Sequence, residues 1–410
     1  MSPSVGAFAA ATQRHPIALN TRTESDMPSF VFQTTPKIVC EQGASLRLHE
    51  LVIPFGAKKV LFITDSGVMR AGIADKPLEA LRLADIDVSV FSDVQADPPE
   101  QVVLSAVDLA RRARADVIIG FGGGSSMDTA KLVALLARTP QQLNDIYGVG
   151  LADGPRLPLI QIPTTAGTGS EVTPISIVTT PSSEKKGVVS PLLLPDVAVL
   201  DSLLTLGVPP AVTAMTGVDA MVHAIESFTS RHKKNAISDS LAIRALQLLY
   251  ANLEEVVMNG GNPNARENML LGSMLAGMAF ANAPVAAVHA LAYPLGGQFH
   301  LPHGLSNSLM LSVVLQFNLP FAEAEYATLG RAILPHLATL SDTEAAMSFV
   351  RAISKKVSKM PYAQSLRAAG IPIDAIPLLA RDALKQQRLL VNNPRDVLHD
   401  DAVALYEAAF

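Results

Sequence analysis

The stretch ADVIIGFGGGSSMDTAKLVALLA, residues 115–137, decides the fold of the chain. An apolar run typical of a buried strand leads into three glycines, Gly122 to Gly124, and then into a helical pattern. Glycines at such a turn let the backbone approach a ligand closely, and Ser125 followed by Asp128 predicts a capped helix start. Free N–H groups at a helix start bind a pyrophosphate. Because Ser125 stands where the last glycine of G-x-G-x-x-G falls, a plain strand-to-helix turn stays open as the alternative.

Four further runs of this kind lie in the first half of the chain, at residues 58–65, 87–93, 157–165 and 197–201. Helix-like segments separate them, which predicts an α/β domain with a mostly parallel sheet. From about residue 209 the pattern is helical throughout. We therefore predict three parts. They are a loose N-terminal extension over residues 1–29, a dinucleotide-binding α/β domain over 30–208 and an all-helical domain over 209–410.

Two other loops favour a nucleotide ligand. Asp65 ends the first strong strand, where an acid accepts hydrogen bonds from the adenosine ribose hydroxyls and repels a 2′-phosphate. Alone, Asp65 is better explained as an ordinary turn residue, but together with the glycine loop it favours NAD over NADP. The loop PTTAGTGSEVTP holds Thr164, Thr165, Thr168 and Thr173 at a strand end. These hydroxyls suit a nucleotide, although a capped helix start also explains them.

The helical half contains a candidate metal site. Asp219 and His223 stand four residues apart in TGVDAMVHAIESF, which places both side chains on one face of a helix. His289, His300 and His303 follow in an apolar context. Asp219, His223, His289 and His303 would form an O,N,N,N site for Fe(II), Zn(II), Mn(II), Co(II) or Ni(II). Each residue alone fits a structural role, but buried imidazoles beside an acid need a reason, because burying unpaired polar groups is costly.

Composition excludes several classes of protein. The 410 residues include 32 basic and 37 acidic ones, a net charge of −5 without a basic patch, which argues against nucleic acid as a partner. The single cysteine, Cys40, excludes an intramolecular disulfide and fits a reducing compartment. With no secretory pattern at the N-terminus, we expect a cytoplasmic protein. The uncharged residues 270–297 could span a bilayer, but Asn282, Pro284 and His289 favour a buried helix pair broken at Pro284.

Several motifs together resemble the iron-containing (group III) alcohol dehydrogenase family, whose members include lactaldehyde reductase and 1,3-propanediol dehydrogenase. The motifs are GGGSSMDTAK, IPTTAGTGSEVTP, KKGVVSPLLLPDVAVLD, GVDAMVHAIES and residues 289–303, and the resemblance covers nearly all of the chain beyond residue 29. It implies the two-domain fold, an NAD(P) cofactor, one catalytic metal, an alcohol or aldehyde substrate and a homodimer or larger homo-oligomer. The implied metal ligands are Asp219, His223, His289 and His303. The implied cofactor-contacting residues are Asp65, Asp97, Gly123, Gly124, Ser125, Asp128, Thr164, Thr165, Thr168 and Lys185. Asp97 departs from the family pattern, which commonly has Asn there.

A second departure concerns catalysis. The family usually carries another His four residues after the third ligand, where this chain has Tyr293. Tyrosine has a reference pKa near 10 and is a poorer proton relay than histidine at neutral pH. Tyr293 is therefore a candidate catalytic residue with an altered role, and His300 is a candidate substitute for the missing histidine.

The expected reaction is hydride transfer between a primary alcohol of short or medium chain and NAD. An ω-hydroxy acid such as 4-hydroxybutyrate or 5-hydroxyvalerate is included, with Arg388 or Arg395 as a possible partner of its carboxylate. Three alternatives stay open. They are a metal-independent enzyme resembling maleylacetate reductase, a catalytically silent nucleotide-binding protein, and a zinc-dependent polyol dehydrogenase of related fold.

Overall fold

The computed structural model describes residues 29–182 and 184–410. The predicted extension over residues 1–29 lies, except for Ser29, outside the described residues. The contacts group Val31–Phe410 into one compact unit. Within the described part of the chain, the last strand ends at Leu200, and helix α6 (Pro210–Thr229) follows. The boundary at residues 208 and 209 stays a prediction.

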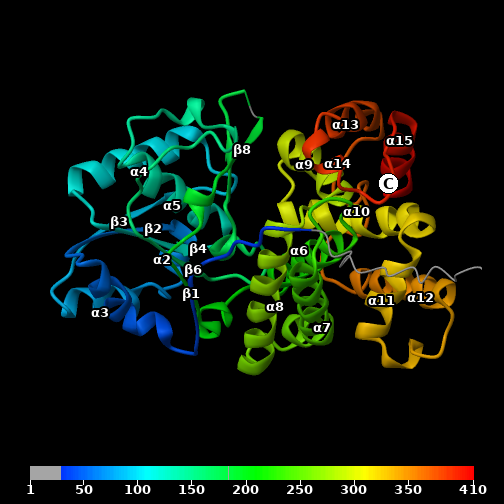
Figure 1. Ribbon diagram of the computed structural model, residues 1–410, viewed down its shortest axis with the longest axis horizontal. Coiled ribbons are helices and arrows are strands. Elements are labelled where there is room, and N and C mark those ends of the chain that lie inside the picture. The colour runs from blue at the N-terminus through cyan, green and yellow to red at the C-terminus, as the bar shows by residue number, and fades with distance from the viewer. Residues whose placement is uncertain (1–28, 183) are drawn as a thin grey trace, which may run out of the picture. The chain divides into compact units, whose positions relative to one another are not determined.

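Six parallel strands form the main sheet, in the order β1-β9-β6-β4-β2-β3 (Figure 1). Each of the five predicted runs contains one of these strands. The sequence pattern does not indicate β1, because this short edge strand is only half buried and lacks the continuous apolar run of a central strand. The strands are β1 (Lys37–Cys40), β2 (Lys59–Asp65), β3 (Asp87–Val94), β4 (Val117–Gly122), β6 (Leu159–Pro163) and β9 (Val197–Leu200).

Helices cover both faces of this sheet, as Figure 1 shows for α3 and α4. In β2, Leu61 and Ile63 pack into an apolar cluster with α4 and α5, whereas Val60 and Phe62 pack into another with α1 and α3. Alternate side chains of a strand point to opposite faces, so an uninterrupted apolar strand serves two cores. The helices of this half are α1 (Leu48–Val52), α2 (Ser66–Arg70), α3 (Asp75–Leu83), α4 (Glu100–Ala113) and α5 (Gly124–Leu136).

A second, three-stranded sheet has the order β5-β8-β7. Its strands are β5 (Gly148–Val149), β7 (Ile175–Thr179) and β8 (Lys185–Val189), and β7 and β8 pair antiparallel with Thr179 opposite Lys185. Short, half-exposed strands carry little hydrophobic pattern, so the sequence does not predict this sheet. It brings Lys185 to the site described below.

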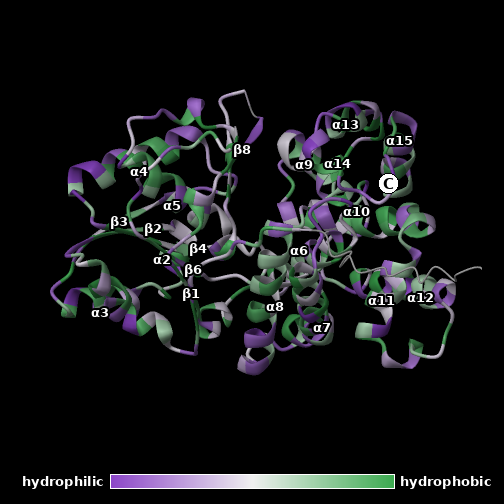
Figure 2. Cartoon of the chain, in the orientation of Figure 1, coloured by the Kyte–Doolittle hydropathy of each residue, from purple (hydrophilic) through white to green (hydrophobic). Residues whose placement is uncertain are grey.

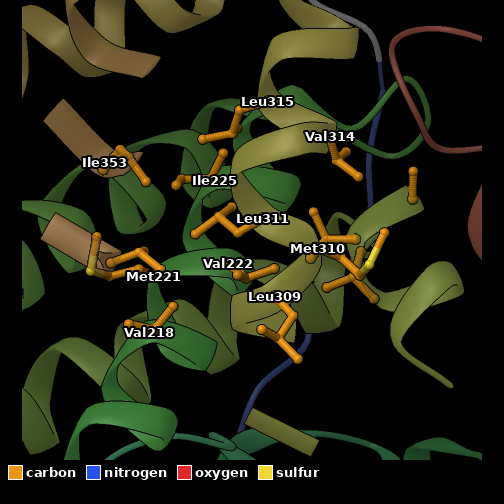
Figure 3. Packing of buried hydrophobic residues seen from close by; sticks show 14 of the residues in the cluster. Val218, Met221, Val222, Ile225, Leu309, Met310, Leu311, Val314, Leu315 and Ile353 are labelled. Atoms are coloured by element: carbon orange, nitrogen blue, oxygen red, sulfur yellow. The ribbon is translucent and has the colours of Figure 1, made fainter. Parts of the chain in front are cut away.

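The second half is helical and packs around α6. Figure 3 shows Val218, Met221, Val222 and Ile225 of this helix within the buried cluster that also holds Leu309 to Leu315 of α10. Most of α6 is buried, including polar positions that no apolar pattern explains. The remaining helices are α7 (Ala236–Met258), α8 (Pro263–Asn282), α9 (Ala287–Phe299), α10 (His303–Asn318), α11 (Glu323–Ile333), α12 (Asp342–Val357), α13 (Ile376–Ala383), α14 (Gln387–Leu390) and α15 (His399–Ala408).

The uncharged stretch forms the predicted helix pair. Helices α8 and α9 meet at 104° across residues 283–286, next to Pro284. Helix α8 changes from hydrophilic at its first turn to hydrophobic further along (Figure 2), and Met274, Ala279 and Leu291 of the pair are buried. In the part of the chain that the structure describes, no single helix is long and apolar enough to cross a membrane. The α8–α9 pair meets those criteria only when its two helices are taken together.

Candidate functional site

The glycine loop lies where the order of the parallel sheet reverses. Strand β2 pairs with β3 on one side and β4 on the other, so the segments after β2 and β4 diverge onto opposite faces. A crevice at the carboxyl ends of such strands is the usual ligand site of doubly wound folds. Gly122 ends β4 with φ +152°, and a Cβ there would lie 2.7 Å from Ser126 Oγ. This position therefore requires glycine.

The capping prediction for the following helix is wrong. Helix α5 begins at Gly124, its N-cap is the extended residue Gly123, and no side chain caps it. Ser125 therefore lies inside the first turn, and Asp128 binds elsewhere. Gly123, in an extended conformation, occupies the N-cap position and has no side chain. The first backbone N–H groups of α5 are therefore not capped by a side chain. Free N–H groups at this position are what a phosphate ligand needs.

Asp65 performs the turn role that the sequence left open. Its Oδ1 accepts hydrogen bonds from the backbone N–H groups of Gly67 and Val68, at 2.8 and 3.0 Å, and so caps α2. Its Oδ2 lies 3.4 Å from Ser126 Oγ on the glycine-loop side. One carboxylate oxygen therefore stabilises the helix, while the other faces the loop.

A cavity of about 550 Å³ brings residues of both halves together. Six of the ten predicted cofactor residues line it, together with Tyr293 and the predicted metal ligands. The six are Asp97, Gly124, Ser125, Asp128, Thr168 and Lys185. The other four, Asp65, Gly123, Thr164 and Thr165, flank the cavity at the strand ends without lining it. The Thr164 N–H donates to the Gly122 carbonyl at 2.9 Å, which holds the threonine loop beside the glycine loop.

Two residues that line the cavity, Lys185 and Asp97, form an ion pair. Lys185 Nζ lies 2.7 Å from Asp97 Oδ1, and Asp97 has a left-handed backbone with φ +50°. The small sheet positions both residues, because Thr179, opposite Lys185, donates its hydroxyl to the Asp97 carbonyl. Lys185 Nζ also lies near Gly296 of α9. The pair thus connects the nucleotide half to the helix that carries His289.

A buried charged network lies behind the glycine loop. Lys131 is fully buried, and its Nζ donates to Ser170 Oγ, Thr173 Oγ1 and the Ile175 carbonyl at 2.7 to 3.0 Å. Asp128 accepts from the Ser170 hydroxyl at 2.6 Å and the Ile177 N–H at 2.9 Å. The network ties α5 to the loop after β6 and to β7, and so fixes the threonine loop against the helix start.

Glu171, in the same loop, is buried, and neither of its carboxylate oxygens has a hydrogen-bond partner among the described residues. Burial raises the pKa of Glu171 to about 7, against the lowering effect of Lys131. Burial also lowers the pKa of Lys131 to about 8, opposed by Asp128 and Glu171. The carboxyl group of Glu171 is therefore more easily protonated in the folded protein than in the unfolded chain.

This raised pKa predicts a pH-dependent stability. A group whose pKa is higher in the folded state stabilises the protein below its unfolded pKa, and that contribution is lost as the pH rises through the folded pKa. For Glu171 the stabilisation is lost as the pH rises from about 4.5 to about 7, and it amounts to about 3 kcal/mol in the free energy of unfolding. We expect Glu171→Gln to remove that part of the pH dependence. Urea unfolding of both metal-free proteins at pH 5 and pH 7 measures it, and an equal pH effect in the two would contradict the prediction.

The four predicted metal ligands converge on one point. Asp219 and His223 lie on α6, His289 lies on α9, and His303 is the first residue of α10. The Asp219 Oδ1 atom is 3.9 Å from Nε2 of His223, 3.9 Å from Nε2 of His289 and 3.7 Å from Nε2 of His303. One donor atom from each residue lies within 4.8 Å of all the others. Helix α6 and the later, consecutive helices α9 and α10 thus place an O,N,N,N donor set in the cavity.

The electrostatics keep these imidazoles ready to bind a cation. Burial lowers the pKa of His223 to about 3 and that of His303 to about 4, although Asp219 opposes both shifts. Burial would raise the pKa of Asp219, but the three imidazoles and Asn307 outweigh it and hold that pKa below its usual value. At neutral pH the site therefore offers His223 and His303 as neutral imidazoles and Asp219 as an ionised carboxylate, the forms that bind metals.

Asn307 shows that the donor set fits a cation. Its Nδ2 lies 2.5 Å from Asp219 Oδ1 and 3.2 Å from Nε2 of both His289 and His303, and its Oδ1 has no hydrogen-bond partner among the described residues. One amide group faces several buried acceptor atoms, so the hydrogen-bonding capacity of these acceptors is only partly used. A divalent first-row cation matches a donor set of one carboxylate and three imidazoles.

The two candidate catalytic residues differ in position. Tyr293 lines the cavity, with its ring centroid 6.0 Å from that of His303. Burial raises the pKa of Tyr293, although the nearby Arg388 lowers it. His300 is exposed, is not among the cavity residues and ends α9 in a left-handed C-cap with φ +55°. The chain leaves the helix at this residue, so the structure does not bring His300 to the site.

Sequence reasoning missed residues that support the ligands. Glu226 follows His223 by three residues, and Asn307 follows His303 by four, so each shares a helix face with a ligand. That spacing is the signal that could have identified them. Phe280, Ala281, Pro284 and Val285 form an apolar part of the cavity wall.

A glycine loop at a sheet switch point shares its cavity with a carboxylate and three imidazoles, an arrangement that could hold a nucleotide and a metal ion. A model of iron-containing alcohol dehydrogenases matches residues 35–202, and one of the C-terminal part of that family matches residues 213–410. The chain belongs to the iron-containing alcohol dehydrogenase family and is an oxidoreductase of that family.

Relatives support this placement over about nine tenths of the chain. Long-chain-alcohol dehydrogenase 1 of Geobacillus thermodenitrificans (strain NG80-2) is 41% identical over 371 residues, which covers 90% of this chain and 93% of the relative. The crystal structure of a 1,3-propanediol oxidoreductase has a TM-score of 0.90 and 34% identity, and covers 93% of this chain and 100% of that chain. Sulfoacetaldehyde reductase from Bifidobacterium kashiwanohense, solved in complex with NAD⁺, has a TM-score of 0.83 and 28% identity, with 93% and 99% coverage.

Proposed function

We propose that this enzyme interconverts a primary alcohol and its aldehyde, with NAD as the hydride carrier and a metal held by Asp219, His223, His289 and His303. The observation that carries this proposal is that all four donors line the cavity that also holds the start of the glycine-loop helix. When bound, the metal polarises the substrate oxygen as a Lewis acid, and NAD exchanges the hydride. Fe(II) is the proposed metal, with Zn(II), Mn(II), Co(II) and Ni(II) able to occupy the same donors.

The chain's own residues bind and orient the reactants. The free N–H groups at the start of α5 bind the pyrophosphate, and the second carboxylate oxygen of Asp65 accepts from a ribose hydroxyl and repels a 2′-phosphate. We therefore propose NAD in preference to NADP. Thr168 and Lys185 line the cofactor side of the cavity. The Tyr293 hydroxyl, whose pKa burial raises, keeps its proton at neutral pH and donates a hydrogen bond to a substrate oxygen.

The part of the cavity that we assign to the substrate has an apolar wall and a positively charged arginine. Phe280, Ala281, Pro284 and Val285 form the wall, and Arg388 lines the same cavity. We propose a short or medium primary alcohol, including ω-hydroxy acids such as 4-hydroxybutyrate and 5-hydroxyvalerate, whose carboxylate would meet Arg388. The names of a long-chain-alcohol relative and a sulfoacetaldehyde relative support an apolar chain and an anionic end, respectively. Arg395 is not among the cavity residues, and its guanidinium instead lies over the Phe317 ring.

Two of the three alternatives from the sequence are not favoured. A metal-independent enzyme resembling maleylacetate reductase, or a silent nucleotide-binding protein, does not require a complete donor set directed at the cofactor cavity. We further propose the domain boundary at residues 208 and 209, a homodimer or larger homo-oligomer, and a cytoplasmic location. Family membership supports the oligomer, and the single cysteine is compatible with a reducing compartment.

The test is to purify the enzyme anaerobically with Fe(II) and to measure metal content and NADH formation together. The alcohols are ethanol, butanol, 1-pentanol, 1,3-propanediol, 4-hydroxybutyrate and 5-hydroxyvalerate. We expect about one metal ion per chain and metal-dependent NADH formation. No bound metal and no turnover with any alcohol would contradict the proposed function.

Replacing Arg388 with alanine tests the proposed anionic end of the substrate. Loss of a charge-assisted hydrogen bond weakens binding by about ten- to a hundredfold. We expect kcat/KM to fall by that factor for 5-hydroxyvalerate and to change little for 1-pentanol, which has the same carbon chain without the carboxylate. Arg395→Ala is the control, because Arg395 does not line the cavity. An equal loss with both substrates would argue against Arg388 as the carboxylate partner.

A further inference from the structure

We propose that Glu226 is a positioning residue for the metal centre, which fixes the tautomer and orientation of His289. Glu226 lies on α6, three residues after His223, and its side chain is 4% exposed as a residue. Its Oε2 lies 2.7 Å from Nδ1 of His289. The inference rests on the proposed metal centre and adds Glu226, a residue that the sequence analysis did not single out.

The hydrogen bonding of Glu226 determines which ring nitrogen of His289 carries the proton. An ionised carboxylate only accepts hydrogen bonds, so Nδ1 of His289 must be the donor. The neutral imidazole then has its lone pair on Nε2, the nitrogen that faces Asp219 at 3.9 Å and the Asn307 amide at 3.2 Å. A carboxylate behind a ligating imidazole also increases the basicity of the imidazole, and such partners usually contribute tenfold to a hundredfold in metal affinity.

The same carboxylate also holds the start of the helix that carries His289. The Ala286 N–H donates to Oε2 at 3.0 Å, and the Val288 N–H donates to Oε1 at 2.7 Å. These are two of the N–H groups at a helix start that have no partner within the helix. Glu226 therefore links α6, which carries Asp219 and His223, to the first turn of α9. Helix α6 thus carries two of the ligands and also the residue that supports a third ligand, His289.

Among the described residues, His289 is the only one of the three imidazoles with a carboxylate on the ring nitrogen that faces away from Asp219. Asp219 itself contacts the Nε2 side of each ring. The orientation of His289 thus depends on Glu226 in a way that has no counterpart at His223 or His303. Removal of this carboxylate therefore affects one ligand, His289, and removes none of the four donor atoms.

Glu226→Gln tests the proposal. A glutamine has one acceptor oxygen, so an amide NH₂ must face either His289 Nδ1 or the Val288 N–H. If it faces His289, the proton of the imidazole moves to Nε2, where it blocks the metal. The control is Ser230→Ala. Ser230 also tethers α6 to the segment before α9, through a 2.8 Å hydrogen bond to the Pro284 carbonyl, but does not contact His289. Glu226→Asp keeps the charge and carries the test if the Gln variant does not fold.

Two readouts are needed. The first is Zn²⁺ and Co²⁺ affinity, measured by competition with a chelating dye on each purified full-length protein. We expect affinity to fall about tenfold to a hundredfold in Glu226→Gln, to recover in part in Glu226→Asp, and to stay within twofold in Ser230→Ala. The second is the histidine tautomer in metal-free protein, measured by ¹⁵N NMR with labelled histidine. We expect His289 to be protonated at Nδ1 in the wild type and to lose that preference in the Gln variant.

Unchanged affinity in Glu226→Gln would overturn the proposal, as would an equal loss in Ser230→Ala, which would indicate helix anchoring alone. An Nε2-protonated His289 in the wild type would also overturn it. A wild-type protein that binds no metal but shows the Nδ1 tautomer would contradict the proposed metal function and leave the positioning of His289 by Glu226 supported. The two failures are therefore distinguishable.

Discussion

Replacing His289 with alanine is expected to abolish metal retention and alcohol-dependent NADH formation. The variant removes one of three imidazoles from a buried four-donor set and leaves a space in place of a ligand. Loss of a supporting residue already lowers metal affinity by about tenfold to a hundredfold, so loss of a direct ligand is expected to exceed that range. Lewis-acid catalysis contributes several kcal/mol, and turnover should therefore fall by at least about a thousandfold.

The measurement combines metal content after desalting with NADH formation on the best alcohol of the panel. NAD binding, measured by protection from thermal unfolding, should be close to that of the wild type, because the glycine loop belongs to a different set of residues. His399→Ala is a matched control, since His399 is exposed and lies outside the cavity. Normal turnover in a metal-depleted His289→Ala enzyme would exclude the proposed ligand set.

Replacing Gly122 with alanine is expected to produce the opposite pattern, with loss of NAD binding and retention of the metal. Gly122 has φ +152°, which alanine adopts only with strain, and the new Cβ would lie 2.7 to 2.8 Å from Ser126. It would also lie 3.4 Å from Asp65 Oδ2, the carboxylate oxygen proposed to accept from the ribose. Strain and displacement together cost a few kcal/mol at the start of α5, which corresponds to at least about a hundredfold in NAD affinity.

Titration calorimetry with NAD⁺ and the KM for NAD⁺ measure this effect, and metal content serves as the folding check. Gly207→Ala is the control substitution, because a Cβ at Gly207 meets no atom within 4 Å and its backbone is not left-handed. If Gly122→Ala binds NAD⁺ as the wild type does, the glycine loop is not the pyrophosphate site. The variants at positions 122 and 289 thus test the cofactor and the metal halves of the site separately.

Several features of the fold follow from residues that are close in sequence. The apolar runs at residues 58–65 and 115–124 form strands β2 and β4, because a strand buried on both faces requires continuous apolar residues. Asp219 and His223 share a helix face because of their spacing. The short strands β5, β7 and β8 are half exposed, so their hydrophobic pattern is weak. Only the family resemblance pointed to Lys185 and Asp97, and their ion pair was not predicted.

Patterns of residues close in sequence did not predict every position of the site correctly. Ser125 and Asp128 match a capping box by spacing, but the extended Gly123 is the N-cap of the helix, and Asp128 joins Ser170 and the buried Lys131 instead. His300 and His303 stand three residues apart, yet one ends α9 in an exposed cap and the other begins α10 in the cavity. The break between two helices decides this difference, and no property of an isolated histidine reveals it.

The sequence by itself predicted the class of fold, the glycine loop and the four candidate metal donors, and its motifs indicated the family, because these depend on residue type and on short motifs. Only the tertiary structure decided which of these residues share a cavity, that Arg388 reaches it while Arg395 does not, and that Glu226 supports His289 across 63 positions of the chain. The physical reason is that a hydrogen bond or a metal site requires atoms within a few ångströms, and the packing of α6, α9 and α10 against one another sets that separation.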